Sequence, residues 1–528
     1  MKVKKGISPT VLSSISVKRV PISFHSNFNK HSSSTAASPK LLISPRRAGY
    51  VLFLLAVSVS LSIFRLNFPP SSPCSDNYPR PRSLNFMSPD WSSTTTTVGG
   101  SYSSEYFWKQ PDGFGFRPCL NFSKEYREAA TNAMFRTRKR YLLVVASGGL
   151  NQQKNQIVDA VVMARIMEAV LVLPVLQVNK VWGDESEFSD IFDERIFKET
   201  LREEVRVVSS LPASHLRRRP AAPPPLPMNM DEEWVRVNLM ERLNKDGILI
   251  LRGFDSRLSK DLHPDLQKLR CKVAFHALKF RPWIEGVGEK LAKRMGKGGP
   301  YMALHLRLEK DVWVRTGCLP GLGDEADRTI ERERKAHPEL LTSRSNMTPH
   351  DRYIAGLCPL NAFEISRLLK GLGASKRTRI YWAGGDPFGG NTALKPLVSS
   401  FPYMYNKWNL TRAGELDQFK HKPSILAAID YIVCLKSHVF MANHGGNMAR
   451  SLQGHRAYNG HQKYIMPNKR ELVKLFVNKS LSEGEMEKEI KMIHANSLGS
   501  PLLRTDKRQR DVIAFPVPEC MCSTKRNS

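Results

Sequence analysis

The residues "YLLVVASGGLNQQKNQ" (141–156) join an apolar run to an amide-rich stretch through two glycines. The apolar run is short and bounded by charges and glycines, which predicts a buried strand. Apolar residues near helical spacing follow it, and "VLVLPVL" then predicts a second strand. A strand, a loop, a helix and a strand in this order are typical of a doubly wound α/β sheet.

The same alternation returns in the second half of the chain. "YMALHLRLE" (301–309) and "RIYWAGG" predict strands, "NAFEISRLLKGLG" predicts a helix, and "SILAAIDYIVCLKSHVFMAN" covers a helix and a strand. We therefore expect an α/β protein with two Rossmann-like domains, 106–285 and 286–505, that face a cleft. The second domain would bind the ligand, and residues 506–528 would form a C-terminal tail with Cys520 and Cys522.

The first 105 residues have a different composition. Residues 1–47 carry nine Lys or Arg and no acid, and residues 48–64, "AGYVLFLLAVSVSLSIF", are 17 residues without a charge. About 17 apolar residues are the lower limit for crossing a bilayer, and the basic flank predicts a cytosolic N-terminus. A cleaved signal peptide is the alternative. Residues 65–105, rich in Ser, Pro and Thr, predict a flexible stem.

A lumenal position for the rest of the chain agrees with its cysteines. All eight lie after residue 64, where an oxidising lumen would let them pair. Cys318 and Cys358 bracket a polar segment and are expected to form a disulfide, whereas Cys434 could equally be a buried thiol. Candidate N-glycosylation sequons stand at Asn121, Asn346, Asn409 and Asn478.

The positive charge of the chain does not by itself indicate that the protein binds nucleic acid. Lys and Arg number 80 against 49 Asp and Glu, a net charge of +31. Part of this excess is the basic tail, and the remainder is spread through mixed-charge segments such as "ERERKAHPEL". No DNA-binding or RNA-binding signature is present in the sequence. The charge therefore indicates a solvated surface and a basic tail.

Polar residues follow several of the predicted strands. Alternation along "ALHLRLEKD" places His305 and Arg307 on one face, and Arg suits bidentate contact with phosphate. Gly445 and Gly446 precede a helix that begins near Asn447, and a helix N-terminus can bind an anion. Each of these features alone could also be an ion-paired surface residue or an ordinary turn.

Two acidic residues are further candidates. Asp386 stands in the glycine-rich turn "AGGDPFGG", which could be a structural turn or a loop that contacts a sugar or a base. Asp430, on the helix before the last predicted strand, could accept from the edge of a base or be an exposed acid.

These segments together resemble a known family. In their order along the chain, "SGGLNQQKNQIVDAVVMAR", "HLRLEKDV", "CPL", "AGGDPFGG" and "DYIVCLKSHVFMANHGGNMARSLQGHR" are similar to the plant O-fucosyltransferase-like glycosyltransferases, from about Tyr106 to Cys522. The resemblance implies a GT-B fold in a single-pass type II Golgi membrane protein. It also implies inverting, metal-independent transfer from a nucleotide sugar, nominally GDP-fucose, to a protein or cell-wall glycan, with no cofactor.

The resemblance also implies roles for individual residues. Arg307 corresponds to the diphosphate-binding arginine, and Asn151 would lie beside the departing sugar, so both are catalytic candidates. The substrate-binding candidates are Gly148, Gly149, Leu150, Gln152, His305, Leu306, Arg307, Asp386, Asp430, Gly446, Asn447 and Met448.

Departures from the family pattern leave the donor sugar and the acceptor open. Many relatives carry Asp where His438 stands, and the turn "GGDPFGG" is also unusual. The alternatives are rhamnosyl transfer from UDP-rhamnose to pectin, or a catalytically silent Golgi scaffold or glycan-binding protein with the same fold. No general base is evident, although Glu309 and Asp311 stand near Arg307.

Overall fold

A computed structural model of the protein describes residues 101–135, 139–178, 183–341, 346–504 and 509–523. All of them belong to one unit, residues 83–528. The basic tail (1–47), the apolar segment (48–64), most of the stem (65–100) and Cys74 lie outside the described residues. In the described part of the chain, no helix has the length and apolar character needed to cross a membrane.

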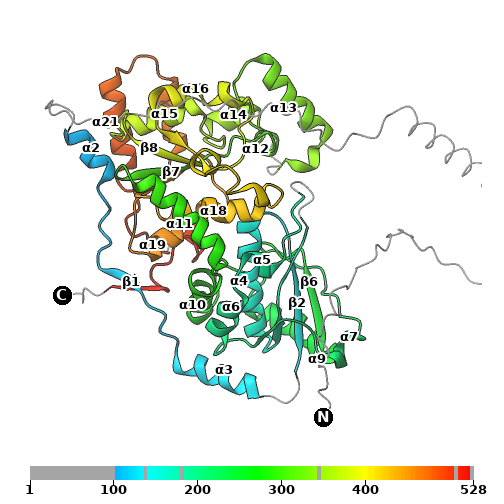
Figure 1. Ribbon diagram of the computed structural model, residues 1–528. Helices are drawn as coiled ribbons and strands as arrows, with labels where there is room; N and C mark the ends of the chain where they lie inside the picture. The colour runs from blue at the N-terminus through cyan, green and yellow to red at the C-terminus, as the bar shows by residue number, and fades with distance from the viewer. Residues whose placement is uncertain (1–100, 136–138, 179–182, 342–345, 505–508, 524–528) are drawn as a thin grey trace, which may run out of the picture. The chain divides into compact units, whose positions relative to one another are not determined.

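The first sheet of the described chain has five parallel strands, which belong to the first predicted α/β set (Figure 1). β2 (Tyr141–Ala146) pairs with β6 (Ile248–Arg252) along one edge. Along its other edge it pairs with β3 (Val170–Val172) and β4 (Val175–Leu176), and β5 (Val207–Val208) extends the sheet from β3. The single strand expected over "VLVLPVL" is thus two strands, interrupted at Pro174, which has no N–H to donate.

The predicted helix after β2 is α4 (Leu150–Ile166), which is buried along nearly its whole length. The other helices of this half of the chain are α2 (Ser101–Trp108), α3 (Lys124–Phe135), α5 (Phe188–Ile191), α6 (Glu194–Leu201), α7 (Ala213–Leu216), α8 (Glu232–Trp234), η1 (Val235–Met240), α9 (Glu241–Asp246), α10 (Pro264–Cys271) and η2 (Lys272–Ala277). Since α2 begins at Ser101, the stem predicted to reach residue 105 is too long by several residues.

The second sheet also has five parallel strands in the described chain, in the order β11-β10-β7-β8-β9. They are β7 (Tyr301–His305), β8 (Arg379–Ala383), β9 (Met404–Tyr405), β10 (Val439–Ala442) and β11 (Tyr464–Ile465). The strand predicted over 301–309 ends earlier, at His305. Its neighbours end beside it, because Ala383 of β8 and Ala442 of β10 both pair with His305. Arg307 therefore lies in the loop after β7.

The helices of the second half include the predicted ones, α15 (Ala362–Gly371), α18 (Pro423–Leu435) and α19 (Asn447–Tyr458). The others are α11 (Pro282–Gly296), α12 (Lys310–Thr316), α13 (Asp324–Ala336), η3 (Pro338–Leu340), α14 (Pro349–Ile354), α16 (Gly390–Ser400), α17 (Lys407–Leu410), η4 (Asp417–Phe419), α20 (Lys469–Val477) and α21 (Glu483–His494). The predicted α/β class with parallel sheets is confirmed.

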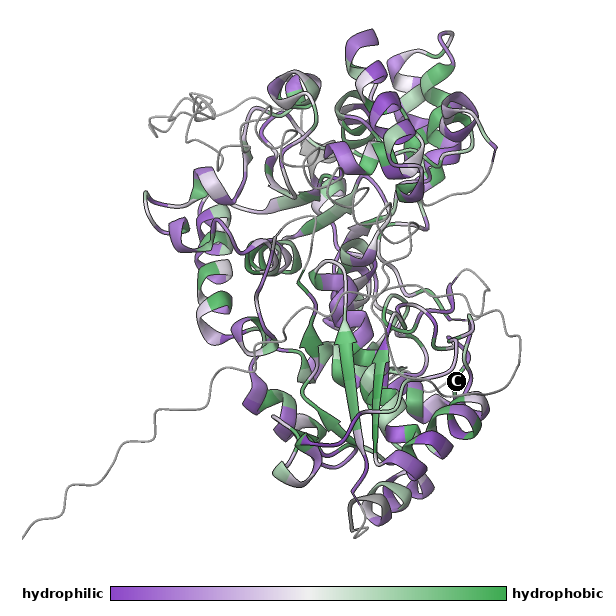
Figure 2. Ribbon diagram, turned by 90° about the vertical axis from the view of Figure 1, so that its right-hand side faces the viewer, coloured by the Kyte–Doolittle hydropathy of each residue, from purple (hydrophilic) through white to green (hydrophobic). Residues whose placement is uncertain are grey.

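One hydrophobic core runs through both sets of elements. Along β7, Tyr301 and Ala303 join a core cluster that also contains Leu142 of β2 and Ile157 of α4, whereas Met302 packs into a second cluster on the opposite face. Helices α4, α18 and α19 lie side by side at the junction (Figure 1). The strands in the lower half of Figure 2 are green, as expected for strands buried on both faces.

The C-terminal segment is not the tail that we expected. β12 (Met521–Ser523) pairs antiparallel with β1 (Phe116–Pro118), and disulfides join Cys522 to Cys119 and Cys520 to Cys271. Buried residues such as Val512 pack into the main core. These contacts reach back to the first half of the chain, so neighbouring residues in the sequence could not reveal them.

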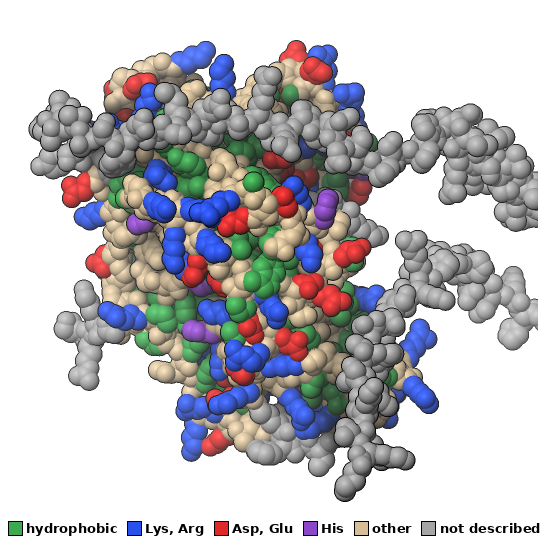
Figure 3. All heavy atoms as spheres, viewed as in Figure 1, with side chains coloured by type: hydrophobic (Ala, Val, Ile, Leu, Met, Phe, Trp, Pro, Cys, Tyr) green, Lys and Arg blue, Asp and Glu red, His purple; other side chains and the backbone are tan. Residues whose placement is uncertain are grey.

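The other cysteines and the sequons are placed as follows. Cys318 forms a disulfide with Cys358, the pair expected from the sequence, and Cys434 is a buried free thiol. The four sequon asparagines are exposed. Blue and red side chains are intermixed on the face shown in Figure 3, in agreement with a solvated mixed-charge surface.

Candidate active site

The loops after β7, β8 and β10 meet at one edge of the second sheet. The three strands are parallel and end level with one another, since His305 pairs with both Ala383 and Ala442. The carboxyl ends of parallel strands form the usual ligand-binding edge of an open α/β sheet. Arg307, the turn with Asp386 and the segment from Asn443 to Asn447 are therefore brought to this edge, as the sequence predicted.

Asn443 fastens the loop that carries Arg307. Its Oδ1 accepts a hydrogen bond from the backbone N–H of Arg307 at 2.7 Å, and its Nδ2 donates to the carbonyl of Leu360 at 2.9 Å. The side chain is fully buried. The sequence analysis did not identify Asn443, and the signal was a polar residue directly after the apolar run "VFMA".

The guanidinium of Arg307 lies against the start of α19. A Cβ atom built on Gly446 would stand 3.3 Å from Nη1 of Arg307, so the absence of a side chain at Gly446 lets the guanidinium approach. Gly446 is the N-cap of α19 and, having no side chain, caps none of the first N–H groups of this helix. Arg307 and these N–H groups together form a site suited to a phosphate.

Glu309 is the ionic partner of Arg307, and the pairing is loose. Its Oε2 lies 3.7 Å from Nε of Arg307, and both side chains are about a quarter exposed, at 25% and 29%. Its Oε1 accepts from the N–H of Gly385 at 3.0 Å. Burial raises the pKa of the Glu309 carboxyl, although Arg307 opposes the shift. The guanidinium of Arg307 is thus partly exposed. An anion with more negative charge than a carboxylate, such as a phosphate, could bind it in place of Glu309.

Two histidines near Arg307 are neutral. Burial lowers the pKa of His305 and of His444 to about 3, and the positive charge of Arg307 adds to both shifts. Nδ1 of His444 lies 3.2 Å from Nζ of Lys469. His305, which the alternation placed on one face of the strand with Arg307, is only 5% exposed. Leu306 is buried in the core on the opposite face of the sheet.

The structure contradicts the interpretation of Asp430 as an exposed acid, because its carboxylate is buried and already paired. Oδ1 accepts from the hydroxyl of Tyr381 at 2.7 Å, and Oδ2 accepts from Nζ of Lys407 at 2.9 Å and from the N–H of Gly384 at 3.2 Å. Lys407 also donates to the carbonyl of Gly384 at 2.9 Å. Asp430 therefore anchors the turn after β8 from beneath, while Asp386 in that turn is exposed.

The Gly148–Gln152 segment follows β2 of the first sheet, and the helix that it begins contacts the start of α19. Gly148 has a φ of +88°, and a Cβ there would collide with the side chain of Gln152. Gly149 is the N-cap of α4, and no side chain caps it. In the second turn of α4, Nδ2 of Asn155 donates to Oδ1 of Asn447 at 3.3 Å. This hydrogen bond joins α4 to the start of α19, which adjoins Arg307.

Asn151, the second catalytic candidate, is buried near the start of α4. In the described part of the chain its Oδ1 has no hydrogen-bond partner. A buried amide oxygen without a partner is costly unless a ligand or water reaches it. Leu150 beside it belongs to the core, and Met448 packs partly buried against the same core.

Asp255 is a site residue that the sequence analysis missed. It follows β6, and it accepts a short hydrogen bond from Nε2 of Gln152. Its Oδ1 also accepts from the hydroxyl of Ser256 at 3.2 Å. The signal was an acidic residue just after the predicted strand "GILILRGF".

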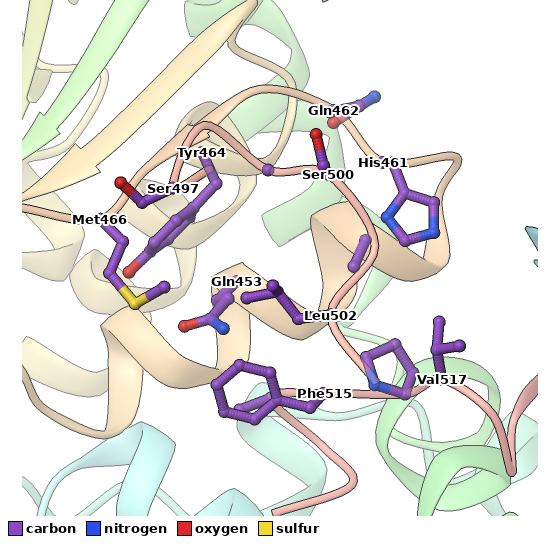
Figure 4. Close-up of a pocket in the computed structure, with 14 residues that line it drawn as sticks. Gln453, His461, Gln462, Tyr464, Met466, Ser497, Ser500, Leu502, Phe515 and Val517 are labelled. Atoms are coloured by element: carbon purple, nitrogen blue, oxygen red, sulfur yellow. The ribbon is translucent and has the colours of Figure 1, made fainter. Parts of the chain in front are cut away.

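The potential metal ligands of the described chain and a hollow in its surface do not add to this site. Within the described ranges, no group of three or more His, Cys, Asp or Glu residues could hold a metal ion. A hollow does occur between the end of α19, β11 and the C-terminal segment, lined by residues including Gln453, His461 and Phe515 (Figure 4). The predicted site residues do not line it.

Comparisons with known proteins identify the family of the chain. Residues 141–459 match the family described as GDP-fucose protein O-fucosyltransferase, and this match spans all the predicted substrate-binding residues. O-fucosyltransferase 20 of Arabidopsis thaliana is 58% identical over 420 residues, which are 80% of this chain and 73% of the relative. O-fucosyltransferase 24 of the same plant is 59% identical over 417 residues, or 79% and 72%.

Solved structures are more distant. A structure of POFUT1 in complex with GDP is 14% identical, with a TM-score of 0.38, over 60% of this chain and 95% of the other. The fucosyltransferase NodZ from Bradyrhizobium is 10% identical, with a TM-score of 0.34, over 63% and 97%. At these scores no residue role is transferred from either structure.

Proposed function

Because the chain belongs to the GDP-fucose protein O-fucosyltransferase family and is a glycosyltransferase, we propose that it transfers fucose from GDP-fucose to a hydroxyl group of a protein or cell-wall glycan. The single observation that carries this proposal is the guanidinium of Arg307 beside the uncapped start of α19. The GDP-fucose donor carries a diphosphate, which this arrangement suits.

The same arrangement has a catalytic use. When the bond between C1 of the sugar and the diphosphate oxygen breaks, negative charge grows on the leaving diphosphate. A preorganised donor aimed at such growing charge contributes about 10²–10³ in rate. Arg307 provides two N–H groups in a fixed fork, and the start of α19 provides backbone N–H groups, so both would stabilise the leaving group.

Asn151 would serve the sugar rather than the diphosphate. Its buried Oδ1 lacks a partner in the described part of the chain. An amide oxygen can accept from a sugar hydroxyl, and its negative end can stabilise the positive charge that develops at C1. We expect Asn151→Ala to lower kcat more than it raises KM, because this charge exists only in the transition state.

We also propose that the transfer needs no metal ion. Arg307 and the N-terminus of α19 supply the positive charge that a metal would otherwise bring to the diphosphate. Turnover should therefore be unchanged after dialysis against EDTA, and restoration of lost turnover by Mg²⁺ or Mn²⁺ would contradict this.

We further propose a single-pass type II protein of the Golgi membrane, with residues 48–64 as the anchor. The exposed sequons and the three disulfides of the described chain are consistent with a lumenal position. Glycosidase treatment should lower the mass of the full-length protein, while protease should remove an N-terminal tag from intact vesicles. An unchanged mass and a protected tag would contradict this topology.

The donor is tested by nucleotide release from a panel of GDP-sugars and UDP-sugars. We expect release of GDP from GDP-fucose, and calorimetry should detect binding of GDP alone. Turnover of UDP-rhamnose in place of GDP-fucose would identify the rhamnosyl alternative. A chain that binds neither nucleotide would be a scaffold of the same fold.

A further inference from the structure

Inverting transfer needs a base on the side of the sugar opposite the leaving group. In inverting sugar chemistry the incoming oxygen approaches the face opposite the bond that breaks, and a carboxylate commonly takes its proton. Glu309 does not meet this requirement, because it lies 3.7 Å from the Arg307 Nε, on the side of the diphosphate. Asp386 directly follows Gly385, whose N–H donates to Glu309, so its backbone lies beside Glu309.

The first sheet offers a carboxylate in a different position. Asp255 follows β6, and β6 pairs in parallel with β2, with Arg252 opposite Val145. The loop after β6 and the Gly148–Gln152 loop after β2 therefore leave the sheet at the same edge. The hydrogen bond from Gln152 to Asp255 joins these two loops directly.

Helix α4 contacts both Asp255 and the start of α19. Gln152, which contacts Asp255, and Asn155, which contacts Asn447 of α19, are three residues apart on α4, and such side chains are about 5–6 Å apart at Cβ. The start of α19 in turn adjoins Arg307. The carboxylate of Asp255 and the start of α19, which Arg307 adjoins, are thus both held against the first two turns of α4, where Asn151 also stands.

We propose that Asp255 is the general base that takes the proton from the acceptor hydroxyl. The acceptor oxygen forms a bond to C1 of the fucose while the bond from C1 to the diphosphate oxygen breaks, and GDP leaves with the electron pair. The acceptor proton passes to Asp255 and then to solvent. This inference rests on the proposed fucosyl transfer and assigns the acceptor side of the site to the β6–α10 loop.

A purely positional role is the competing explanation. In that case Asp255 would only hold Gln152 and thereby the loop that begins α4. The two roles differ in their response to azide, which attacks C1 without losing a proton. Azide can replace the function of a missing base, but it cannot restore a displaced loop.

The test measures GDP release from GDP-fucose with water as the acceptor, using the full-length protein. Asp255→Ala should lower the release about 100-fold or more, the usual range for loss of a general base, while GDP binding stays unchanged. Sodium azide should restore part of the lost release in this variant and yield fucosyl azide. It should not restore Arg307→Ala, and Asp417→Ala, which changes an exposed carboxylate in η4, should behave like wild type.

Several results would overturn the inference. Release of GDP by Asp255→Ala at the wild-type rate would contradict a role as base, and failure of azide to restore release would leave only the positional role. If Asp255→Ala does not fold, the isosteric Asp255→Asn takes its place, with the same expected loss and the same rescue. A wild-type protein that releases no GDP from GDP-fucose would overturn the proposed function, and this inference with it.

Discussion

The turns after β8 and β10 lie on either side of the loop after β7, and the charged groups beside them are held in opposite ways. Beneath the turn after β8, Asp430 and Lys407 are buried and bonded to each other and to both backbone groups of Gly384. In the loop after β7, next to the turn after β10, Arg307 is partly exposed and its ion pair with Glu309 is loose. The comparison indicates that fully paired charges build the site, whereas a loosely paired charge is available to bind the donor.

Asp430→Ala should give the largest effect. It leaves Lys407 buried without its carboxylate, and breaking a buried ion pair typically costs about 3–5 kcal/mol of the free energy of unfolding. Urea denaturation measures this loss, with Asp417→Ala as the control, since Asp417 pairs with Lys420 in the open. A stable Asp430→Ala protein that has lost only GDP binding would show that Asp430 binds the nucleotide after all.

Asn443→Ala should have an intermediate effect. It removes the acceptor for the Arg307 N–H and the donor to the Leu360 carbonyl, and an unpaired buried group costs about 1–3 kcal/mol. Turnover should also fall, because the loop that carries Arg307 loses its fastening. Asn459→Ala, at the exposed far end of α19, is the matched control for both measurements. Full activity in Asn443→Ala would separate Asn443 from the placement of Arg307.

Glu309→Gln should give the smallest effect on stability. The amide can still accept from the N–H of Gly385, and a loose, partly exposed ion pair contributes only about 0–1 kcal/mol. Removing this negative charge should strengthen GDP binding by about two- to fivefold, a change of under about 1 kcal/mol. Calorimetry on Glu309→Gln and on Glu333→Gln, a surface carboxylate paired with Lys310, makes the comparison. Weaker GDP binding in Glu309→Gln would mean that Glu309 holds Arg307 in its binding position.

The sequence was sufficient to predict those strands and helices whose formation depends on residues close together in the chain. Strands such as β2 and β8, and the helices α4 and α19, follow from apolar periodicity that ends at glycines. Because parallel strands bring their carboxyl ends to one edge, the meeting of Arg307 with the start of α19 could also be predicted.

Long-range pairing set the limit of the prediction. Asp430 is bonded to Lys407 and Tyr381, which stand 23 and 49 residues away, and no local pattern reveals such partners. The C-terminal segment is held by cysteines 249 and 403 residues apart. Asp255 and Asn443 acquire their places only when separate loops meet. For these two residues, the sequence shows a polar side chain after a strand, but it does not show which residue that side chain contacts.

The central claim is that Arg307 stabilises the leaving diphosphate of GDP-fucose. The direct measurement is GDP release and melting temperature for wild type, Arg307→Ala and Arg307→Lys, side by side. We expect Arg307→Ala to lose about 10²–10³ in rate with an almost unchanged melting temperature. Arg307→Lys should recover little, since a point charge cannot reproduce the two-pronged contact of a guanidinium. Near-normal release by Arg307→Lys, with a lowered melting temperature for Arg307→Ala, would show that Arg307 only holds its loop and would contradict the claim.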